Sequence, residues 1–220
     1  ADNLKTLAAE ALEAGVADLE IADGGIRVVG TDRAITLAEL AAKAGPDAAA
    51  LKSDSKWTPP EATYPNGTHV CEIELDPDLG EVEVVLYHVV DDFGVTLNPL
   101  LLAGQVHGGI VQGIGQALHE RTVYDEDGQL VTASFMDYRL PRAQDIPAIH
   151  FETRNVPSTT NALGMKGAGE AGAIGSCPAV INAVVDALHH AYGIRHIDMP
   201  ATPDAVMAAI NGAGPAGSAA

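Results

Sequence analysis

The chain has 220 residues, 47% of them hydrophobic and only 4% aromatic, which is enough apolar material for one or two cored domains. Thirty acidic against twelve basic residues give a net charge of −18, which argues against nucleic acid and anionic membranes as partners, because both are bound through Lys and Arg. Cys71 and Cys177 lie too far apart in sequence for a metal-ligand cluster or a disulfide framework. We see no apolar run of transmembrane length and no signal peptide, and we expect a cytoplasmic protein.

The first 45 residues are predicted to form a helix–hairpin–helix segment. Apolar residues at helical spacing predict a helix over residues 3–14, and short apolar runs on either side of Asp23-Gly24-Gly25 predict a β-hairpin. Thr36 and Glu39 form a capping-box pattern that begins a second, short helix. The polar, proline-bearing residues 46–67 that follow are predicted to be a linker.

A domain with several strands is predicted over residues 68–212, followed by a disordered tail over residues 213–220. Strands over 69–75 and 82–90 flank a turn signal, and the second strand should be central because it is apolar on both faces near its end. Asp91 and Asp92 are predicted to form a turn. The remaining elements are a hairpin of 122–124 with 130–134, a strand over 149–156 and a helix over 178–191. The fold class is therefore α+β, with mixed β-sheets and packed helices.

A glycine-rich helix is predicted over residues 104–118. Val106 and Ile110 begin an i+4 repeat of apolar residues, yet the helix contains several glycines, each costing about 1 kcal/mol relative to alanine. Such a helix needs tertiary packing, and its glycines mark places where another backbone or a flat ligand approaches. Gln105 and Gln112, two turns apart, would lie on one buried face, where their amides could read a polar heterocycle. The alternative is that Gln105 only caps the helix start.

The most informative stretch runs from Gly164 to Gly175, where five glycines surround Lys166 and Glu170. Glycine permits positive φ and close approach, and a single carboxylate on such a loop, just before a helix, is placed as a general base requires. Lys166 is expected to pair with a carboxylate. The loop lacks the ending of a Walker loop and the preceding strand of a dinucleotide-binding turn. From spacing alone, a tight turn with a solvated Glu170 is the alternative.

Four runs, in this order, together resemble the molybdenum hydroxylases, the family of xanthine dehydrogenase, aldehyde oxidase and carbon monoxide dehydrogenase. The resemblance covers residues 1–210 and is to the C-terminal portion of the molybdopterin-binding subunit. The runs are Val90-Asp91-Asp92-Phe93-Gly94 with Asn98-Pro99, Gly104-Gln105-Val106-His107-Gly108-Gly109 with Gln112-Gly113-Ile114-Gly115, Ser134-Phe135-Met136-Asp137-Tyr138, and Leu163-Gly164-Met165-Lys166-Gly167-Ala168-Gly169-Glu170.

The resemblance implies a molybdenum-dependent oxidoreductase that inserts water-derived oxygen into an electrophilic C–H bond. Glu170 would be the base that deprotonates the molybdenum-bound hydroxyl. Contacts to molybdopterin, as its cytosine dinucleotide, would come from Gln105, Lys166, Gly167, Ala168 and Gly169, and no residue of the chain would ligate the metal. Electrons would leave through a [2Fe–2S] subunit and a FAD subunit.

The resemblance also implies that the chain works only with other chains. The family's subunit is several times longer, so we expect a hetero-oligomer in which a further chain supplies the N-terminal part. Because the sequence opens within a helical pattern and without Met, we expect a split, processed or excised piece. The substrate stays open between aldehydes, N-heterocycles and carbon monoxide. Two alternatives remain: a non-catalytic interaction module that has kept the fold, and an unrelated acid–base enzyme. The glycines retained around Glu170 favour catalysis.

Overall fold

The computed structural model describes residues 1–44, 54 and 56–213, which divide into two compact units, Ala1–Thr58 and Pro59–Ala220. Most of the predicted linker, residues 46–53 and 55, lies outside the described residues, and at its other end Asn66 already belongs to a strand. Of the predicted tail, Ala213 ends a helix and the rest lies outside the described residues.

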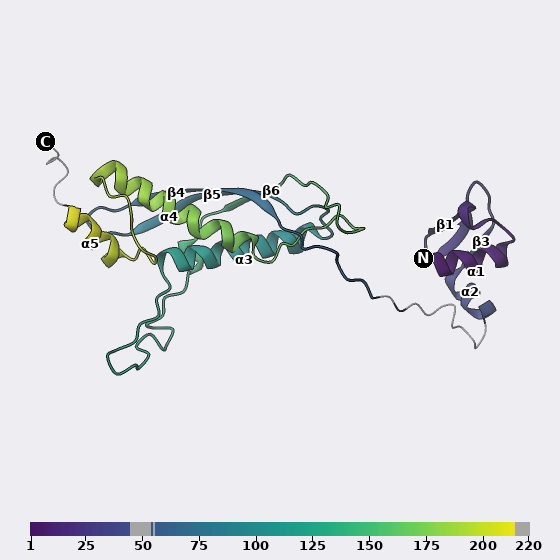
Figure 1. Cartoon of the computed structure of the whole chain (residues 1–220), viewed down its shortest axis with the longest axis horizontal. Coiled ribbons are helices and arrows are strands. Elements are labelled where there is room, and N and C mark those ends of the chain that lie inside the picture. Colours follow the sequence, from purple (N-terminus) through teal and green to yellow (C-terminus); the bar gives the residue numbers. More distant parts are fainter. Residues whose placement is uncertain (45–53, 55, 214–220) are drawn as a thin grey trace. The chain divides into compact units, whose positions relative to one another are not determined.

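The first unit combines a three-stranded antiparallel sheet with two helices (Figure 1). The predicted helix, hairpin and capping box are confirmed, and Glu39 accepts hydrogen bonds of 2.9 Å from both the N–H and the hydroxyl of Thr36. The third strand was not predicted, because three residues are too short for a visible alternation. The core consists of Ala8, Leu12, Leu19, Ile26, Ile35 and Leu40. In chain order the elements are α1 (Asp2–Leu12), the 3₁₀ turn η1 (Val16–Asp18), β1 (Leu19–Ala22), β2 (Gly25–Val28), β3 (Ala34–Thr36) and α2 (Leu37–Ala44).

The second unit is built on a mixed sheet of β4 (Asn66–Leu75), β5 (Val82–Asp92) and β6 (Ile149–Thr153), with β5 in the centre as predicted. β4 pairs antiparallel with β5, and β6 pairs parallel with it. The predicted turn at Asp91 and Asp92 is wrong: both residues lie in β5. Because β4 and β6 offer pairing partners on both sides, the strand continues through these two aspartates.

Three helices complete the second unit: α3 (Pro99–Leu118), α4 (Ala171–Tyr192) and α5 (Pro203–Ala213), of which α5 was not predicted. α3 begins earlier than predicted, with Asn98 as its N-cap accepting from Leu101 N at 3.1 Å, so Gln105 is not a cap. α4 begins seven residues before Pro178, which therefore lies inside the helix and not in its first turn. The glycines that made this segment look like a loop are held in the helix by packing, which outweighs their low helix propensity.

Glycines set the contact between α3 and α4, which lie side by side in Figure 1. A Cβ on Gly172 would meet Ile110 N at 2.8 Å and Val106 O at a still shorter distance, and one on Gly109 would meet Gly172 Cα at 3.0 Å. The two backbones therefore touch, as predicted for α3. α4 is, among the described helices, the one long and apolar enough to cross a membrane, but Val180, Val184 and Leu188 bury one face of it in the protein core.

Residues 119–148 leave the end of α3 as an arm that extends from the sheet and helices (Figure 1). The predicted hairpin forms only around its turn: Tyr124 and Leu130 pair in an antiparallel bridge, and Val131 N donates to Val123 O at 2.8 Å. In the described residues the two arms do not extend into regular strands, because this exposed segment has no third strand beside it. The arm returns to the sheet through η3 (Ala143–Asp145).

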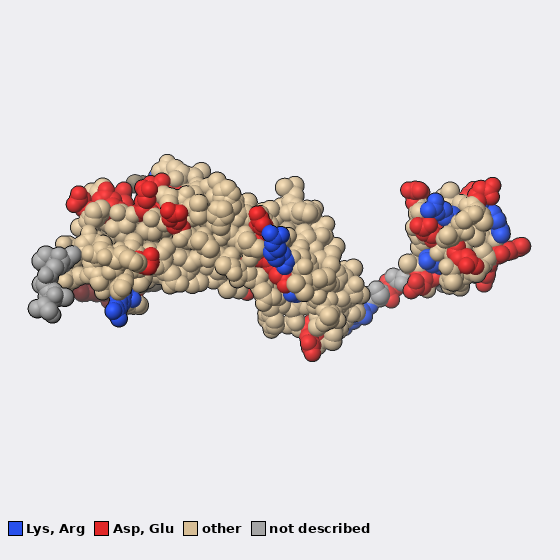
Figure 2. Space-filling view, turned by 90° about the horizontal axis from the view of Figure 1, so that it is seen from above, with Lys and Arg blue, Asp and Glu red and all other residues tan. Residues whose placement is uncertain are grey.

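Charged side chains are unevenly distributed over the second unit. In the view of Figure 2, acidic side chains gather toward the end that carries α5, and a broad surface without Lys, Arg, Asp or Glu adjoins them. The sequence agrees with this distribution, since residues 93–118 contain no Asp, Glu, Lys or Arg.

Candidate active site

Residues 161–170 form a loop that is tied to the end of the central strand. The Asn161 side chain accepts from Met165 N at 3.1 Å and donates to Met165 O at 2.9 Å. Lys166 N donates to Phe93 O at 2.9 Å, directly after β5. Each of these bonds uses a polar group that would otherwise be half-buried and unpaired. These bonds therefore fix the position of the residues that precede Glu170 in the loop.

Lys166 forms an ion pair with Asp92, with 2.5 Å between Nζ and Oδ2, and both side chains are largely buried. Partial burial works to raise the pKa of Asp92, but hydrogen bonds from Lys166 Nζ, Val156 N and Gly94 N outweigh it and bring the pKa to about 2. The prediction that Lys166 pairs with a carboxylate is confirmed. Its ammonium group holds the loop to β5.

The five glycines between Gly164 and Gly175 serve two different purposes. Gly164 has φ +68°, Gly172 touches α3, and a Cβ on Gly175 would lie 2.6 Å from His69 Cε1. These three are needed by the fold itself. By contrast, a Cβ on Gly169 would meet nothing within 4 Å, and one on Gly167 would meet only Thr63 O at 3.7 Å. The second pair leaves open backbone beside Glu170, where another molecule can approach closely.

Gln105 and Glu170 are brought together by this loop. Gln105 Nε2 donates to Gly169 O at 2.7 Å, which ties α3 to the loop one residue before Glu170. Glu170 is the N-cap of α4, its side chain makes no capping hydrogen bond, and it is exposed, as are Gln105 and Gln112. The buried face predicted for the two glutamines is therefore wrong within this chain. Among the described residues, none forms a hydrogen bond with the Glu170 carboxylate, which lies at the positive end of a 22-residue helix dipole.

Sequence reasoning missed the residues that hold the loop. Thr63 Oγ1 accepts from Gly167 N at 3.3 Å, although the two residues are 104 positions apart. Asn155 Oδ1 accepts from Phe93 N at 3.0 Å and so holds the residue whose carbonyl oxygen binds the loop at Lys166 N. A possible signal is the pair of asparagines at 155 and 161, since Asn side chains bond to nearby backbone.

A buried polar cluster lies under the first turns of α4. His69 Nδ1 lies 2.8 Å from the Tyr87 hydroxyl, and His69 Nε2 lies 3.6 Å from the buried carboxylate of Asp91. Burial raises the pKa of Tyr87 far above its usual range, so the phenol stays protonated. Because Gly175 packs directly on the His69 ring, this cluster supports the helix that begins after Glu170.

His107 belongs to the core and not to the loop. Its ring packs edge-on against Phe151, with 6.2 Å between ring centroids, as expected for a packed histidine. In residues 1–44 and 56–213 no group of three or more His, Cys, Asp and Glu side chains could hold a metal ion.

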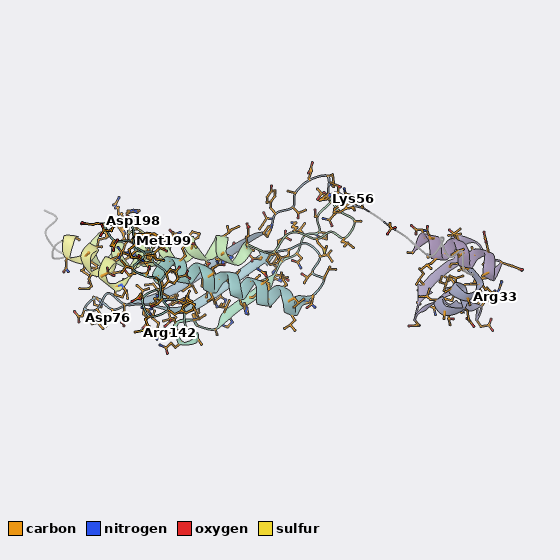
Figure 3. The ribbon with its side chains drawn as sticks, turned by 90° about the horizontal axis from the view of Figure 1, so that it is seen from below. Arg33, Lys56, Asp76, Arg142, Asp198 and Met199 are labelled. Atoms are coloured by element: carbon orange, nitrogen blue, oxygen red, sulfur yellow. The ribbon has the colours of Figure 1, made fainter. Side chains whose placement is uncertain are left out.

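A cleft of about 760 Å³ lies away from the loop, between the β4–β5 turn, the end of α3 and the start of α5. Figure 3 labels Asp76, which lines the cleft, near the end of the unit that carries Asp198 and Met199. Carboxylates dominate its lining, and burial lowers the pKa of His119 beside it, with Arg139 adding to the effect. None of the predicted site residues lines this cleft, so we place the site at the open loop.

The fold and the loop define a domain that exposes open glycine backbone, the Gln105 amide and the Glu170 carboxylate close together on one loop. The family model of the molybdopterin cofactor-binding domain matches residues 1–147. Subunit gamma of the 6-hydroxypseudooxynicotine dehydrogenase complex of Paenarthrobacter nicotinovorans is 39% identical over 96% of the chain and 27% of that protein. The carbon monoxide dehydrogenase large chain of Hydrogenophaga pseudoflava is 35% identical over 90% of the chain and 25% of that protein.

The solved quinoline 2-oxidoreductase of Pseudomonas putida 86 matches with a TM-score of 0.86 and 33% identity, over 96% of the chain and 28% of that subunit. The chain therefore belongs to the molybdopterin-binding family of the molybdenum hydroxylases, and the predicted fold class is confirmed. It spans about a quarter of the length of these relatives.

Proposed function

We propose that the chain is part of the catalytic subunit of a molybdenum hydroxylase and that Glu170 is its general base. The observation that carries the proposal is the free carboxylate of Glu170 beside the open backbone of Gly167 and Gly169, on a loop fixed by Gln105 and Lys166. A base needs an acceptor oxygen that is not already engaged, and no capping bond occupies this one.

The residues of the loop fit the edge of a pterin. The backbone of Gly167, Ala168 and Gly169 can approach a flat ring closely because two of the three residues have no Cβ to keep it away. The Gln105 amide is bonded to this backbone through Nε2, which donates to Gly169 O, so its Oε1 retains the capacity to accept a hydrogen bond. Lys166 contributes by holding the loop to Asp92.

The molybdenum cofactor, when bound, would supply the two-electron oxidation of the substrate, and we propose the cytosine dinucleotide form. Glu170 would take the proton from the water-derived nucleophile and orient it toward the substrate carbon. Electrons would pass to [2Fe–2S] and FAD subunits, and the remaining three quarters of the subunit would come from a further chain or segment. We propose a cytoplasmic hetero-oligomer.

The substrate we favour is a nitrogen heterocycle or an aldehyde. Two relatives with 39% and 36% identity carry nicotine or 6-hydroxypseudooxynicotine in their names. Carbon monoxide is the second candidate, because two relatives with 35% and 36% identity are named carbon monoxide dehydrogenases.

The test is Glu170→Gln in the native complex that contains this chain. We expect turnover to fall by about 10²–10⁴-fold with molybdenum content unchanged, since the substitution keeps the shape and removes the base. Glu152→Gln, an exposed carboxylate on β6, is the matched control and should leave turnover unchanged. Turnover near the wild-type rate in Glu170→Gln would refute the base, and a native complex without molybdenum would refute the cofactor.

A further inference from the structure

The cleft of about 760 Å³ between the β4–β5 turn, the end of α3 and the start of α5 has a strongly acidic lining, and we call it the acidic cleft. Its volume lies within the range of about 300–1,000 Å³ that is typical of small-molecule sites. Six carboxylates line it against one guanidinium, that of Arg139, so the lining attracts cations. The carboxylates are those of Glu74, Asp76, Asp78, Glu81, Glu83 and Asp145.

Two of these carboxylates lie directly opposite each other in the sheet. Glu74 on β4 pairs in register with Glu83 on β5, and both residues are exposed. Among the described residues, none forms an ion pair or a hydrogen bond with either side chain. Like charges directly opposite each other on antiparallel strands repel and destabilise the sheet. A cation bound close to both carboxylates would relieve this repulsion.

His119, which follows α3 and lines the acidic cleft, is a buried polar side chain that the fold leaves without a partner. It is only 9% exposed, and among the described residues neither Nδ1 nor Nε2 has a hydrogen-bond partner. Buried polar groups are nearly always hydrogen-bonded, so an unpartnered imidazole on the wall of a cleft indicates a ligand group. Burial lowers the pKa of His119, and the charge of Arg139 adds to the effect. The ring is therefore uncharged at neutral pH, and one of its nitrogens can accept a hydrogen bond from a cation.

The walls of the acidic cleft are fixed to one another. Ala201 N donates to Ala117 O at 2.7 Å, which ties the segment before α5 to the end of α3. A Cβ on Gly80 would lie 2.5 Å from Pro203 O, so the β4–β5 turn packs directly on the start of α5. The cleft is therefore formed by the fold itself, and a ligand would bind to groups that are already in place.

The lining of the acidic cleft favours one class of cation. In the part of the chain that the structure describes, no group of three or more His, Cys, Asp and Glu side chains could hold a metal ion. The lining also includes Leu75, Val82 and Leu118, on which a methylene chain can pack. We infer that the acidic cleft binds a linear aliphatic polyamine, whose ammonium groups lie against the carboxylates and donate to His119. This site would be independent of the proposed function, because the cleft and the loop of Glu170 share no residue.

The experiment is calorimetric titration of spermidine into the native complex that contains this chain, in buffer with about 0.1 M salt, which screens distant charges. We expect one saturable site per copy of the chain. Glu74→Gln with Glu83→Gln should weaken binding by about 10-fold or more and should not lower Tm, because it removes a like-charge pair. Glu126→Gln with Glu152→Gln is the matched control, which removes the same charge from exposed positions outside the cleft and should leave the affinity unchanged. Equal weakening in the two double variants, or no saturable site, would overturn the inference.

Two variants of His119 test its part in the site by the same titration. His119→Leu should weaken spermidine binding by about 10-fold without lowering Tm, because it removes a ring whose nitrogens have no partner in the unliganded fold. His119→Gln keeps a hydrogen-bonding group and should retain most of the affinity. Unchanged affinity in His119→Leu, or equal losses in the two variants, would overturn the inference. None of these measurements depends on molybdenum content or turnover, so their failure would leave the proposed function standing.

Discussion

Gly172 determines how closely α3 and α4 approach, and Gly172→Ala tests that contact. The new Cβ would lie 2.8 Å from Ile110 N and 3.0 Å from Gly109 C, where ordinary contacts begin at about 3.4 Å. Since the opposing atoms are backbone, no side-chain rotation relieves the overlap, and the helices have to separate by roughly 0.5–1 Å. Overpacking of this kind lowers the free energy of unfolding by about 1–3 kcal/mol, and we expect about 3 kcal/mol because the overlap is with backbone atoms.

Alanine at position 172 regains about 1 kcal/mol of helix propensity, so the net loss is about 2 kcal/mol. For a unit of this size, that corresponds to a fall in Tm of roughly 4–8 °C, measured by circular dichroism at 222 nm. Gly108→Ala is the matched control, because a Cβ there meets nothing, and it should raise Tm by up to about 4 °C. A Tm for Gly172→Ala at or above the wild-type value would show that the backbone contact does not restrict this position.

Three further predictions concern the loop, the start of α3 and the cysteines. Because the folded pKa of Asp92 lies near 2 and the unfolded one near 3.9, its stabilisation is full above about pH 4 and is lost as the pH falls toward 2. Lys166→Met should therefore lower the free energy of unfolding by about 3 kcal/mol at pH 7. Urea titrations at several pH values should show that this difference from wild type becomes smaller below pH 4. A difference that stays constant with pH would contradict the ion pair. Asn98→Ala should cost about 1 kcal/mol through the lost N-cap, whereas Asn182→Ala, on the exposed middle of α4, should be neutral or stabilising in the same assay. Burial raises the pKa of Cys71 to about 11, so its reaction with a thiol reagent at pH 8 should be roughly 100-fold slower in the native protein than in urea; equal rates would mean that the thiol is not buried.

Secondary structure was predicted correctly from the sequence where a single local pattern indicated the element. The β5 strand, its central place in the sheet, predicted because it is apolar on both faces, and the Thr36–Glu39 capping box follow from local rules that tertiary contacts reinforce. The start of α4 was missed because Gly172 and Gly175 have loop-like propensity, and only their contacts with α3 and His69 explain a helix there.

For the candidate site, the sequence indicated Glu170 and its glycines but not the bonds that fix them. Gln105 and Gly169 are 64 residues apart, and Lys166 and Asp92 are 74 apart, so no spacing rule connects them. The role of Asp92 was missed because Asp91 and Asp92, two residues ahead of Gly94, have the composition of a turn. Which glycines serve the fold and which leave open backbone depends on their three-dimensional neighbours.

A protein with a net charge of −18 and one apolar end, where Leu100, Leu101 and Ile174 are exposed, is an amphiphile on the scale of a whole domain. Its acidic surface repels other copies over a distance of about 10 Å at 0.1 M salt, while the apolar end attracts them only at contact. Added salt shortens the range of the electrostatic repulsion and does not weaken the apolar attraction. The isolated chain should therefore stay dispersed in dilute buffer and associate as salt is added.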